Sequence, residues 1–293
     1  MKILVTGING SVGGNVYRYL LDIYGNYVEG ISRSKYFFKK KNKNEIIYKE
    51  DFINPTKDSI FYEKYDCIIH AAAITPKSAK SQNDFITNNV ISKCFLKKLN
   101  LFKGKFIHLS SASVYETSNF PLNENSTLTQ KDKYGISMYE SENIFKNKLS
   151  HIIIFRIFYP YGFDKFTIRD NLVDKLLNRI QNNLPLTVNS LYKNTFINPL
   201  FINDLNLIVN LFLNNKIKSD IYNLAGPNHI KFNDFLIYLH KKLNINKNKK
   251  SILINDSMPI PHSGEINKLL TLIPKESLTS FKSGLNNIKL DKL

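Results

Sequence analysis

The sequence predicts an α/β protein with a doubly wound parallel sheet and a smaller C-terminal substrate-binding lobe. Short, nearly continuous apolar runs alternate with segments that carry apolar residues at helical spacing. That alternation is typical of parallel strands covered by helices on both faces. A glycine-rich segment also joins the first apolar run to the first helical segment. The 293 residues, 43% of them hydrophobic, are enough for a packed core of one large domain or two small ones.

The first 160 residues hold the regular part of the pattern and are expected to form the first domain. Six strands are predicted, each from a short apolar run: Lys2–Val5, Tyr27–Ile31, Ile46–Tyr48, Cys67–His70, Phe106–Leu109 and Ile152–Arg156. Three helices are predicted between them, from apolar residues at helical spacing: Val12–Tyr24, Phe85–Phe102 and Tyr134–Leu149.

The second lobe, residues 161–293, has a less regular pattern. Helices are expected at Arg169–Gln181, Asp204–Leu213 and Phe232–Leu243, with short strands near Leu200–Ile202 and Ile221–Leu224. No Pro/Gly/Ser-rich linker precedes this lobe, so we expect both lobes to share one body.

The net charge of +17 raises the question of a nucleic-acid partner, and the composition argues against one. Only five of the 41 basic residues are arginines, the residue most used for bidentate contacts to bases and phosphates. The two lysine-rich runs, at residues 39–43 and 247–250, lie between periodic segments and are interpreted as solvated loops. The surplus charge still favours attraction of an anionic small molecule.

The sequence also bears on membrane insertion, secretion, disulfide bonds and metal binding. No apolar run approaches the length of a membrane span, and the short apolar start does not continue as a signal peptide. Two cysteines give no disulfide framework, and the six histidines show no metal-ligand spacing. We therefore expect a cytoplasmic protein with no bound metal.

The strongest motif is the glycine-rich segment Thr6-Gly7-Ile8-Asn9-Gly10-Ser11-Val12-Gly13. It comes after a strand and opens a helix, the context in which Gly7 permits a tight turn and Gly10 lets the backbone approach a pyrophosphate. Gly13 lets the helix pack closely on the sheet, and the helix N-terminus supplies amide donors. The motif predicts a Rossmann-type dinucleotide site.

The end of the second strand bears on which dinucleotide binds. An NAD site usually has an acidic residue here for the ribose hydroxyls, but Ser32 occupies that place. Arg33 beside it is able to pair with a 2′-phosphate, whereas Glu29 is expected inside the strand and is discounted. The sequence therefore favours NADP over NAD and leaves NAD as the alternative.

Several motifs in order make the chain resemble the extended short-chain dehydrogenase/reductases, specifically the NAD-dependent epimerase/dehydratase group that acts on nucleotide sugars. The resemblance continues from the glycine motif through nearly the whole chain, in these segments: Asp51-Phe52, His70-Ala71-Ala72-Ala73, Asn89-Val90, Leu109 to Tyr115, Tyr134-Gly135-Ile136-Ser137, Arg156 to Gly162, Phe201 to Asp204, and Tyr222 to Gly226.

The resemblance implies roles for individual residues. Ser111 is the expected orienting serine and Tyr134 the general acid/base, while a hydride moves to or from the nicotinamide. The implied cofactor-binding residues are Gly7, Asn9, Gly10, Ser11, Val12, Gly13, Ser32, Arg33, Asp51, Phe52, Ala71, Ala72, Ala73, Asn89 (as a structural asparagine), Tyr134 and Tyr159. The implied substrate-binding residues are Thr75, Ser113, Arg169 and Lys193.

The chain departs from the family pattern at Met138. Similar proteins have Tyr-x-x-x-Lys, and Met138 takes the place of the lysine one helical turn after Tyr134. A lysine there holds the nicotinamide ribose and lowers the tyrosine pKa, and methionine does neither. Lys131 and Lys133 are not one turn away on the same face. Three interpretations stay open: an enzyme with a slower or altered proton relay, a relative that binds without turnover, and an engineered substitution that traps a ligand.

The two residues directly after Ser111 narrow the reaction. The dehydratase branch carries an Asp-Glu pair there, and this chain has Ala112 and Ser113, so dehydration is disfavoured. Reduction of a 4-ketone, C4 epimerisation and C4 oxidation remain, and the signs of NADP and the missing lysine favour reduction. An arginine that often grips the substrate diphosphate is also missing from residues 194–199. The expected partners are a nucleotide sugar and, through the helices at 85–102 and 134–149, a second copy of the chain.

Overall fold

A computed structural model describes residues 1–34, 45–55, 60–163, 171–215, 217–243, 252–256 and 262–288. Its centre is a seven-stranded sheet in the order β3-β2-β1-β4-β5-β6-β9, with every neighbouring pair parallel. The strands are β1 (Ile3–Thr6), β2 (Val28–Ser32), β3 (Ile47–Lys49), β4 (Cys67–His70), β5 (Lys105–Ser111), β6 (Ile152–Ile157) and β9 (Ile221–Leu224). The predicted α/β class with a parallel sheet is confirmed.

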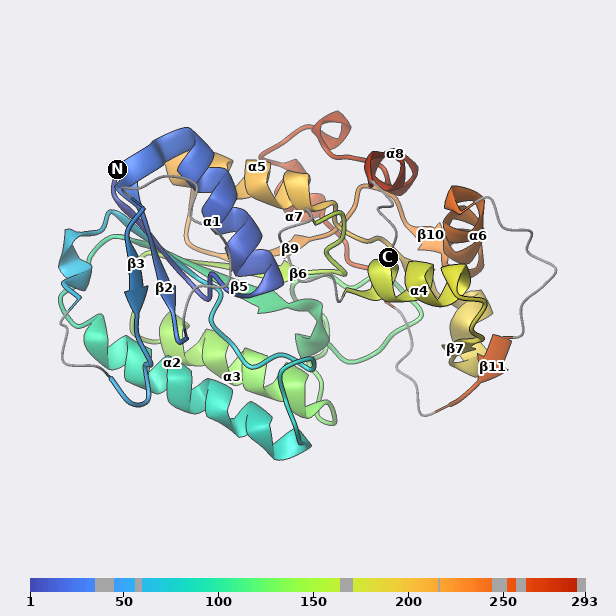
Figure 1. The fold of residues 1–293 in the computed structure, drawn as a ribbon, viewed down its shortest axis with the longest axis horizontal. Helices are drawn as coiled ribbons and strands as arrows, with labels where there is room; N and C mark the ends of the chain where they lie inside the picture. Colours follow the sequence, from blue (N-terminus) through green and yellow to red (C-terminus); the bar gives the residue numbers. More distant parts are fainter. Residues whose placement is uncertain are drawn as a thin grey trace.

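Helices cover both faces of this sheet (Figure 1). One layer contains α1 (Ser11–Tyr24) and α5 (Ile202–Asn214), which pack against each other. The opposite layer contains α2 (Ile86–Lys98) and α3 (Lys133–Lys146). Because both faces are covered, the strands other than the edge strand β3 are buried along almost their whole length, which explains the continuous apolar runs in the sequence.

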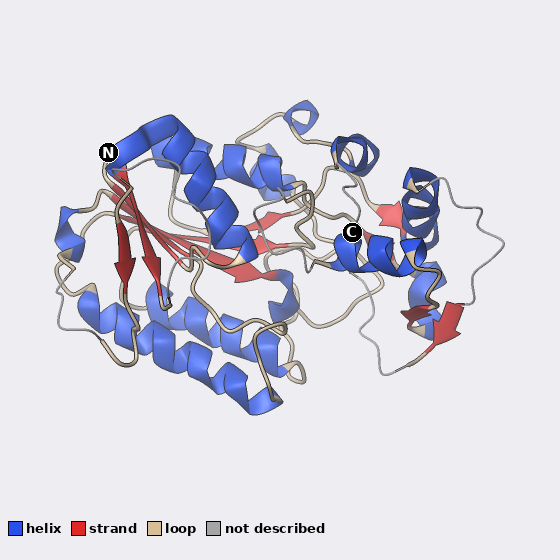
Figure 2. Ribbon diagram, viewed as in Figure 1, coloured by secondary structure: helices blue, strands red, loops and turns tan. Residues whose placement is uncertain are grey.

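The smaller lobe lies beside one end of the sheet and has a hydrophobic core of its own (Figure 2). Its helices are α4 (Leu172–Gln181), α6 (Phe232–Lys242) and α8 (Phe281–Asn287). Two small sheets accompany them, formed by β8 (Phe196–Ile197) with β10 (Ile230–Lys231) and by β7 (Leu186–Val188) with β11 (Ile252–Ile254). The short helix α7 (Asn267–Leu270) contacts β9 instead.

The chain returns to the large sheet after it has entered the smaller lobe. Both α5 and β9 come after residue 161 in sequence and yet belong to the body of the first 160 residues. The strand predicted at Leu200–Ile202 is wrong: Phe201 makes only an isolated bridge to Tyr161, and α5 already begins at Ile202. The apolar run there is the start of an amphipathic helix, and a run of three residues does not distinguish the two.

Within the described residues, no helix is long and apolar enough to cross a membrane. The same part of the chain contains no group of three or more His, Cys, Asp or Glu side chains arranged to hold a metal ion. Cys67 and Cys94 are both free thiols.

Candidate functional site

The predicted site residues gather at the carboxyl edge of the sheet, because parallel strands end on the same side. The glycine-rich turn comes after β1, Ser32 ends β2, and the Ala71–Ala73 segment comes after β4. Ser111 ends β5 and is the register partner of Ile157 at the end of β6. One edge therefore collects the phosphate-binding turn and the proposed reacting groups.

The glycine-rich turn is packed too tightly to admit side chains. Gly7 has φ +72°, and a Cβ placed on it would lie 2.7 Å from the backbone carbonyl of Ala71. A Cβ on Gly13 would lie 2.6 Å from the Gly7 oxygen. The Gly10 amide closes the turn by donating to the Gly7 carbonyl (2.9 Å), and α1 begins at Ser11 with no side-chain cap. A dinucleotide pyrophosphate fits such a turn, since backbone amides at a helix N-terminus face the site.

Thr6 joins the turn to the neighbouring strand. Its hydroxyl accepts a hydrogen bond from the Ala71 amide (3.2 Å) and shares another with His70 Nδ1 (2.8 Å). Burial lowers the pKa of His70 well below its usual value, so its ring is neutral at pH 7. His70 and His108 are both buried strand residues, as the sequence suggests.

Asn9 and Ser32 meet where the ribose end of a dinucleotide is expected. The Asn9 amide donates to the Ser32 hydroxyl (2.6 Å) and to the Ser34 hydroxyl (3.3 Å). Ser32 is buried, whereas Arg33 is exposed next to it. The structure therefore brings Asn9 and Ser32, two residues that the sequence assigned to the cofactor, into contact, and the third, Arg33, follows Ser32 in the chain.

Glu29 takes no part in this corner. It lies inside β2, 1% exposed, with Lys2 Nζ at 2.7 Å and Lys64 Nζ at 3.3 Å. The hydroxyls of Tyr48 and Tyr65 donate to the same carboxylate. Burial would raise the pKa of Glu29, but these hydrogen bonds outweigh it and hold that pKa below its usual value. The prediction that Glu29 lies inside the strand and is not a ribose ligand is consistent with this geometry.

Asp51 and Phe52 are held in different surroundings. The Asp51 carboxylate accepts from the amides of Ile53 (2.9 Å) and Asn54 (3.4 Å), which shapes the turn after β3. The Phe52 ring is buried and stacks on Phe95 with centroids 4.3 Å apart. The Phe52 side chain therefore belongs to the core, and a role for it in cofactor binding rests on its backbone.

The segment after β4 is tied down by an asparagine that sequence reasoning missed. Asn88 accepts from the Ile74 amide (2.6 Å), donates to the Ile74 carbonyl (3.0 Å) and donates to Ser137 on α3 (3.0 Å). The resemblance placed the structural asparagine at Asn89, whose amide reaches Glu140 instead. One residue along a helix turns a side chain by about 100°, which puts Asn88 on the buried face. The burial of Asn88 in the structure is what distinguishes it from Asn89.

Ser111 and Tyr134 lie near each other at the carboxyl edge of the sheet, and the Ser111 side chain acts on the pKa of the Tyr134 phenol. Ser111 ends β5, and its hydroxyl accepts from the Ser113 amide (3.2 Å). Tyr134 lies in the first turn of α3, where the Asp132 carboxylate caps the helix by accepting from the Tyr134 amide (3.1 Å). Gly135 lets the first turn of α3 pack closely against Ser113, because a Cβ at position 135 would lie 1.9 Å from the Ser113 carbonyl oxygen.

The protonation state of Tyr134 depends on these surroundings. Burial raises the pKa of Tyr134 to about 12, the nearby Ser111 side chain opposes that rise, and the Asp132 carboxylate adds to it. The phenol is therefore protonated at neutral pH. Such a group is ready to donate a proton to an oxygen and poorly suited to remove one.

Met138 supplies no charge to this pair. It is 2% exposed and is part of the main hydrophobic core. Lys133, the adjacent cation in sequence, donates instead to Asn83 (3.2 Å), which lies in the short turn before α2. The expectation that Lys133 does not replace the family lysine agrees with this contact.

Tyr159 lies just beyond β6, between the cores of the two lobes. Its φ of 42° is a left-handed conformation that costs a non-glycine residue on the order of 1–3 kcal/mol. Its hydroxyl is 3.4 Å from His262 Nδ1 and accepts from the His262 amide at 3.4 Å. Burial raises the pKa of Tyr159 to about 12.

The four predicted substrate-binding residues are spread over the chain. Ser113 stands in the turn against Gly135, and Thr75 is exposed in the segment after β4. Lys193 is exposed in the smaller lobe, 5.9 Å from the Tyr192 ring centre, and its described contact does not reach Ser111 or Tyr134. Arg169 lies outside the described residues.

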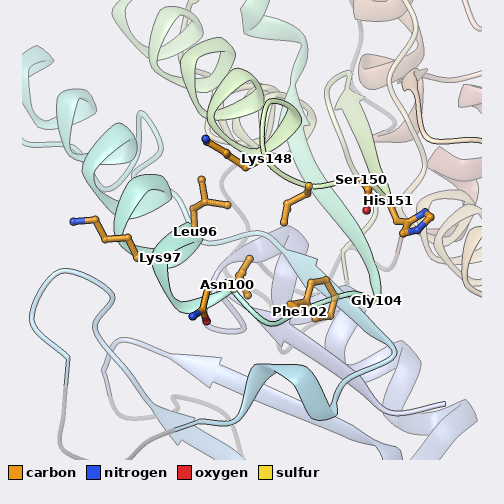
Figure 3. A pocket seen from close by; sticks show the side chains of 10 residues that line it. Leu96, Lys97, Asn100, Phe102, Gly104, Lys148, Ser150 and His151 are labelled. Atoms are coloured by element: carbon orange, nitrogen blue, oxygen red, sulfur yellow. The ribbon is translucent and has the colours of Figure 1, made fainter.

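Two hollows lie at the amino ends of β5 and β6, the opposite edge of the sheet. The first, about 340 Å³, is lined by Leu96, Lys97, Phe102 and Lys148, near the ends of α2 and α3 (Figure 3). The second, about 500 Å³, shares Gly104 and His151 with it. Lysines at helix C-termini stabilise the negative ends of the helix dipoles. Neither hollow includes a predicted site residue.

The fold and the glycine-rich turn together are those of a Rossmann-type protein, with Ser111 and Tyr134 near each other at the carboxyl edge of the sheet. Residues 3–225 match the model of the NAD dependent epimerase/dehydratase family, and the chain belongs to that family.

Individual relatives agree with this placement. The chain is 26% identical over 256 residues to an ADP-L-glycero-D-manno-heptose-6-epimerase of Brachyspira hyodysenteriae, covering 78% of this chain and 77% of that protein. It is similar in fold to the UDP-glucuronic acid 4-epimerase of Bacillus cereus, solved with UDP-glucuronic acid and NAD, with TM-score 0.82, 24% identity and 98% of each chain covered. The dTDP-glucose 4,6-dehydratase DesIV of Streptomyces venezuelae gives TM-score 0.79 at 18% identity, covering 98% of this chain and 95% of that one.

Proposed function

We propose that this protein is an NAD(P)-dependent oxidoreductase or epimerase that acts on a nucleotide-activated sugar, by 4-keto reduction or C4 epimerisation. The observation that carries the proposal is the proximity of Ser111 and Tyr134 at the same sheet edge as the glycine cradle. The names of the similar proteins support the substrate class, because each acts on or was solved with a nucleotide sugar.

The chain's own residues divide the chemistry between them. A bound nicotinamide cofactor supplies or accepts the hydride. Ser111 orients the sugar oxygen by a hydrogen bond, and protonated Tyr134 donates its proton to that oxygen as a ketone becomes an alcohol. The high pKa of Tyr134 and the neutral side chain at Met138 both favour this direction over alcohol oxidation. Substrate contacts are assigned to Thr75, Ser113 and Lys193.

The cofactor assignment is NADP in preference to NAD. Ser32 is neutral and already bonded to Asn9, and Arg33 is the exposed cation beside them, where a 2′-phosphate would lie. The structural neighbours were solved with NAD, so NAD is the alternative.

A second candidate is a binding protein of the same fold that holds cofactor and sugar without turnover. The buried, uncharged Met138 favours it, since an unassisted tyrosine with a pKa of about 12 is almost never a phenolate at neutral pH. The two candidates bind the same ligands and differ only in hydride transfer.

The experiment that separates them begins with titration of the purified protein with NADH and NADPH, monitored by the fluorescence of the reduced nicotinamide. Loaded protein is then mixed with a panel of 4-keto and 4-hydroxy nucleotide sugars, and absorbance at the nicotinamide band is recorded. We expect tighter NADPH binding and oxidation of NADPH by a 4-keto sugar, abolished in Tyr134→Phe. Cofactor binding without any absorbance change would favour the binding protein, and no cofactor binding would end both proposals.

We also propose a cytoplasmic homodimer that associates through α2 and α3. Ile86 and Val90 support this, because they are 63% and 39% exposed on the outer side of α2. Light scattering of the wild type and of Ile86→Glu tests it: a dimer that dissociates in the variant is expected, and a monomeric wild type would contradict it.

A further inference from the structure

A buried ion pair lies beneath the helix that carries Tyr134. Glu142 on α3 accepts from Arg156 on β6, with Nη2 at 2.7 Å and Nε at 3.0 Å. Glu142 is 1% exposed and Arg156 is 2% exposed. The Ser110 hydroxyl, one residue before Ser111, donates to the same carboxylate at 2.6 Å. Three elements of the active edge therefore meet at one carboxylate.

Arg156 also has partners other than Glu142. Its Nη1 donates to the Glu124 carbonyl (3.2 Å), and its guanidinium lies 4.8 Å from the ring centre of Tyr115. The Tyr115 hydroxyl in turn donates to Asn223 on β9 (2.6 Å). Arg156 therefore has polar or aromatic partners on both sides. A buried polar cluster needs such partners, because unpaired buried polar groups carry a large desolvation cost.

Two contacts together fix how α3 sits on β5 and on the short turn after it. At the first turn of α3, Gly135 packs directly on the carbonyl of Ser113 in that short turn. Two turns later, Glu142 is bonded to Ser110. A helix held at one point can still rotate or slide, whereas two points separated by seven residues prevent both. Tyr134 is adjacent to the first contact, and Ser111 is adjacent to the second.

General energetics argue that such a pair does little for stability. Replacing a buried ion pair by apolar residues of similar volume is often neutral or stabilising, while removing one partner is strongly destabilising. The ion pair is therefore expected to have a role that apolar packing cannot have. Its directional hydrogen bonds from Ser110 and Arg156 to Glu142 fix the rotation of α3 about its axis.

We propose that Glu142 and Arg156 are positioning residues, which hold the Tyr134 hydroxyl close to Ser111 by locking α3 to β5 and β6. The expected effect on reaction rate rests on the proposed function. The expected effect on the position of Tyr134 rests on the geometry alone.

The test is the paired replacement Glu142→Leu with Arg156→Met, which removes the directional bonds and leaves no unpaired charge. The control is Ser92→Ala with Ser141→Ala, which removes a buried bond of α3 to α2 (2.5 Å) and leaves the β5 contact intact. Rates are measured in the wild type, or in Met138→Lys if only that variant turns over.

For the paired replacement we expect a melting temperature at or above that of the wild type and cofactor affinity within threefold. The rate of hydride transfer should fall at least tenfold through kcat, with KM little changed. The control should keep its rate within threefold. A paired replacement that keeps both its melting temperature and its rate would overturn the inference, since the ion pair would then be only a packing element.

A second readout does not depend on turnover. 3-Fluorotyrosine placed at position 134 reports its surroundings through the fluorine NMR shift and its titration. We expect the shift and the phenol pKa to change in the paired replacement and to stay in the control. If no variant transfers hydride, the proposed reaction fails, and the fluorine signal still decides the inference: an unchanged signal contradicts it.

If the paired replacement does not fold, Ser110→Ala takes its place, because it keeps the ion pair and removes only the link to β5. We expect a two- to fivefold fall in kcat and a shifted fluorine signal. No change in either would overturn the inference.

Discussion

The glycine-rich turn after β1 and the Ser111–Tyr134 pair after β5 lie at one edge of the sheet but differ in completeness. The turn has backbone contacts that exclude side chains at Gly7 and Gly13, as expected of a pyrophosphate-binding turn. The pair lies close together and has its helix cap, but position 138 carries a buried methionine where the resemblance predicts a lysine. On the proposed function, cofactor binding and proton transfer are therefore separable in this chain.

The largest effect is expected at the turn. Gly7→Ala forces a Cβ to 2.7 Å from the Ala71 carbonyl at a φ of +72°, which we expect to cost about 3 kcal/mol in unfolding free energy and to abolish cofactor binding. Denaturant unfolding and nucleotide titration measure the two effects. Gly25→Ala is the matched control, because Gly25 has φ +54° and nothing within 4 Å, so backbone strain on the order of 1–3 kcal/mol applies without a clash and away from the cofactor site. Equal losses in both variants would contradict the packing argument.

A substitution at the other region should leave binding intact. Gly135→Ala places a Cβ 1.9 Å from the Ser113 carbonyl and pushes the start of α3 away from β5. We expect hydride transfer to fall at least 100-fold while cofactor affinity changes less than threefold, which stopped-flow absorbance and titration will separate. A parallel loss of affinity would show that the two regions are not independent.

The layer between the two regions predicts sensitivity to acid. Burial lowers the pKa of His108 from 6.5 to about 4 and that of His70 well below 6.5. The unfolded chain binds more protons than the folded one in this window, so stability is complete above pH 6.5 and is lost as pH falls toward 4. Each pKa unit corresponds to about 1.4 kcal/mol. His108→Phe should flatten the curve of melting temperature against pH between 6.5 and 4, and the exposed His151→Asn should not. An unchanged slope in His108→Phe would contradict the account.

The smallest effect concerns the choice of dinucleotide. Arg33→Ala removes an exposed cation beside Ser32, and an exposed charge contributes about 1 kcal/mol or less. We expect NADPH affinity to fall about fivefold and NADH affinity to stay constant, measured by fluorescence titration. A wild type that binds NADH more tightly, with Arg33→Ala changing neither, would overturn the NADP assignment.

The sequence predicted most of the sheet and helices because apolar periodicity and the glycine turn are local signals. Strand Cys67–His70 and helix Phe232–Leu243 agree with β4 and α6 to within a residue. What local signals did not show is tertiary: that β9 completes the large sheet after a long excursion, and that Asn88 holds Ile74. The strand expected near Leu200–Ile202 failed because a helix start and a short strand have the same composition.

In the candidate site, too, sequence motifs identified some residues, whereas tertiary contacts became visible only in the structure. Motif order assigned Ser111 and Tyr134 to one reacting pair and Asn9 and Ser32 to one cofactor site, and the structure brings each pair close together. The ion pair of Glu142 and Arg156 gave no separate signal, because the two residues are distant in sequence and meet only when β6 pairs with β5. The roles assigned to Thr75, Tyr159 and Lys193 stay predictions.

The central claim is that the chain binds its cofactor fully and lacks only the charge beside Tyr134. Its most direct test compares hydride transfer in the wild type, Met138→Lys and Met138→Leu over pH 5 to 10, at saturating cofactor and with the same nucleotide-sugar panel. Lowering a tyrosine pKa by one unit is worth about 1.4 kcal/mol, or tenfold. The account predicts that Met138→Lys raises alcohol oxidation at least tenfold and moves its pH midpoint downward, with a smaller gain in ketone reduction and none in Met138→Leu. Unchanged rates in both directions for Met138→Lys would contradict it.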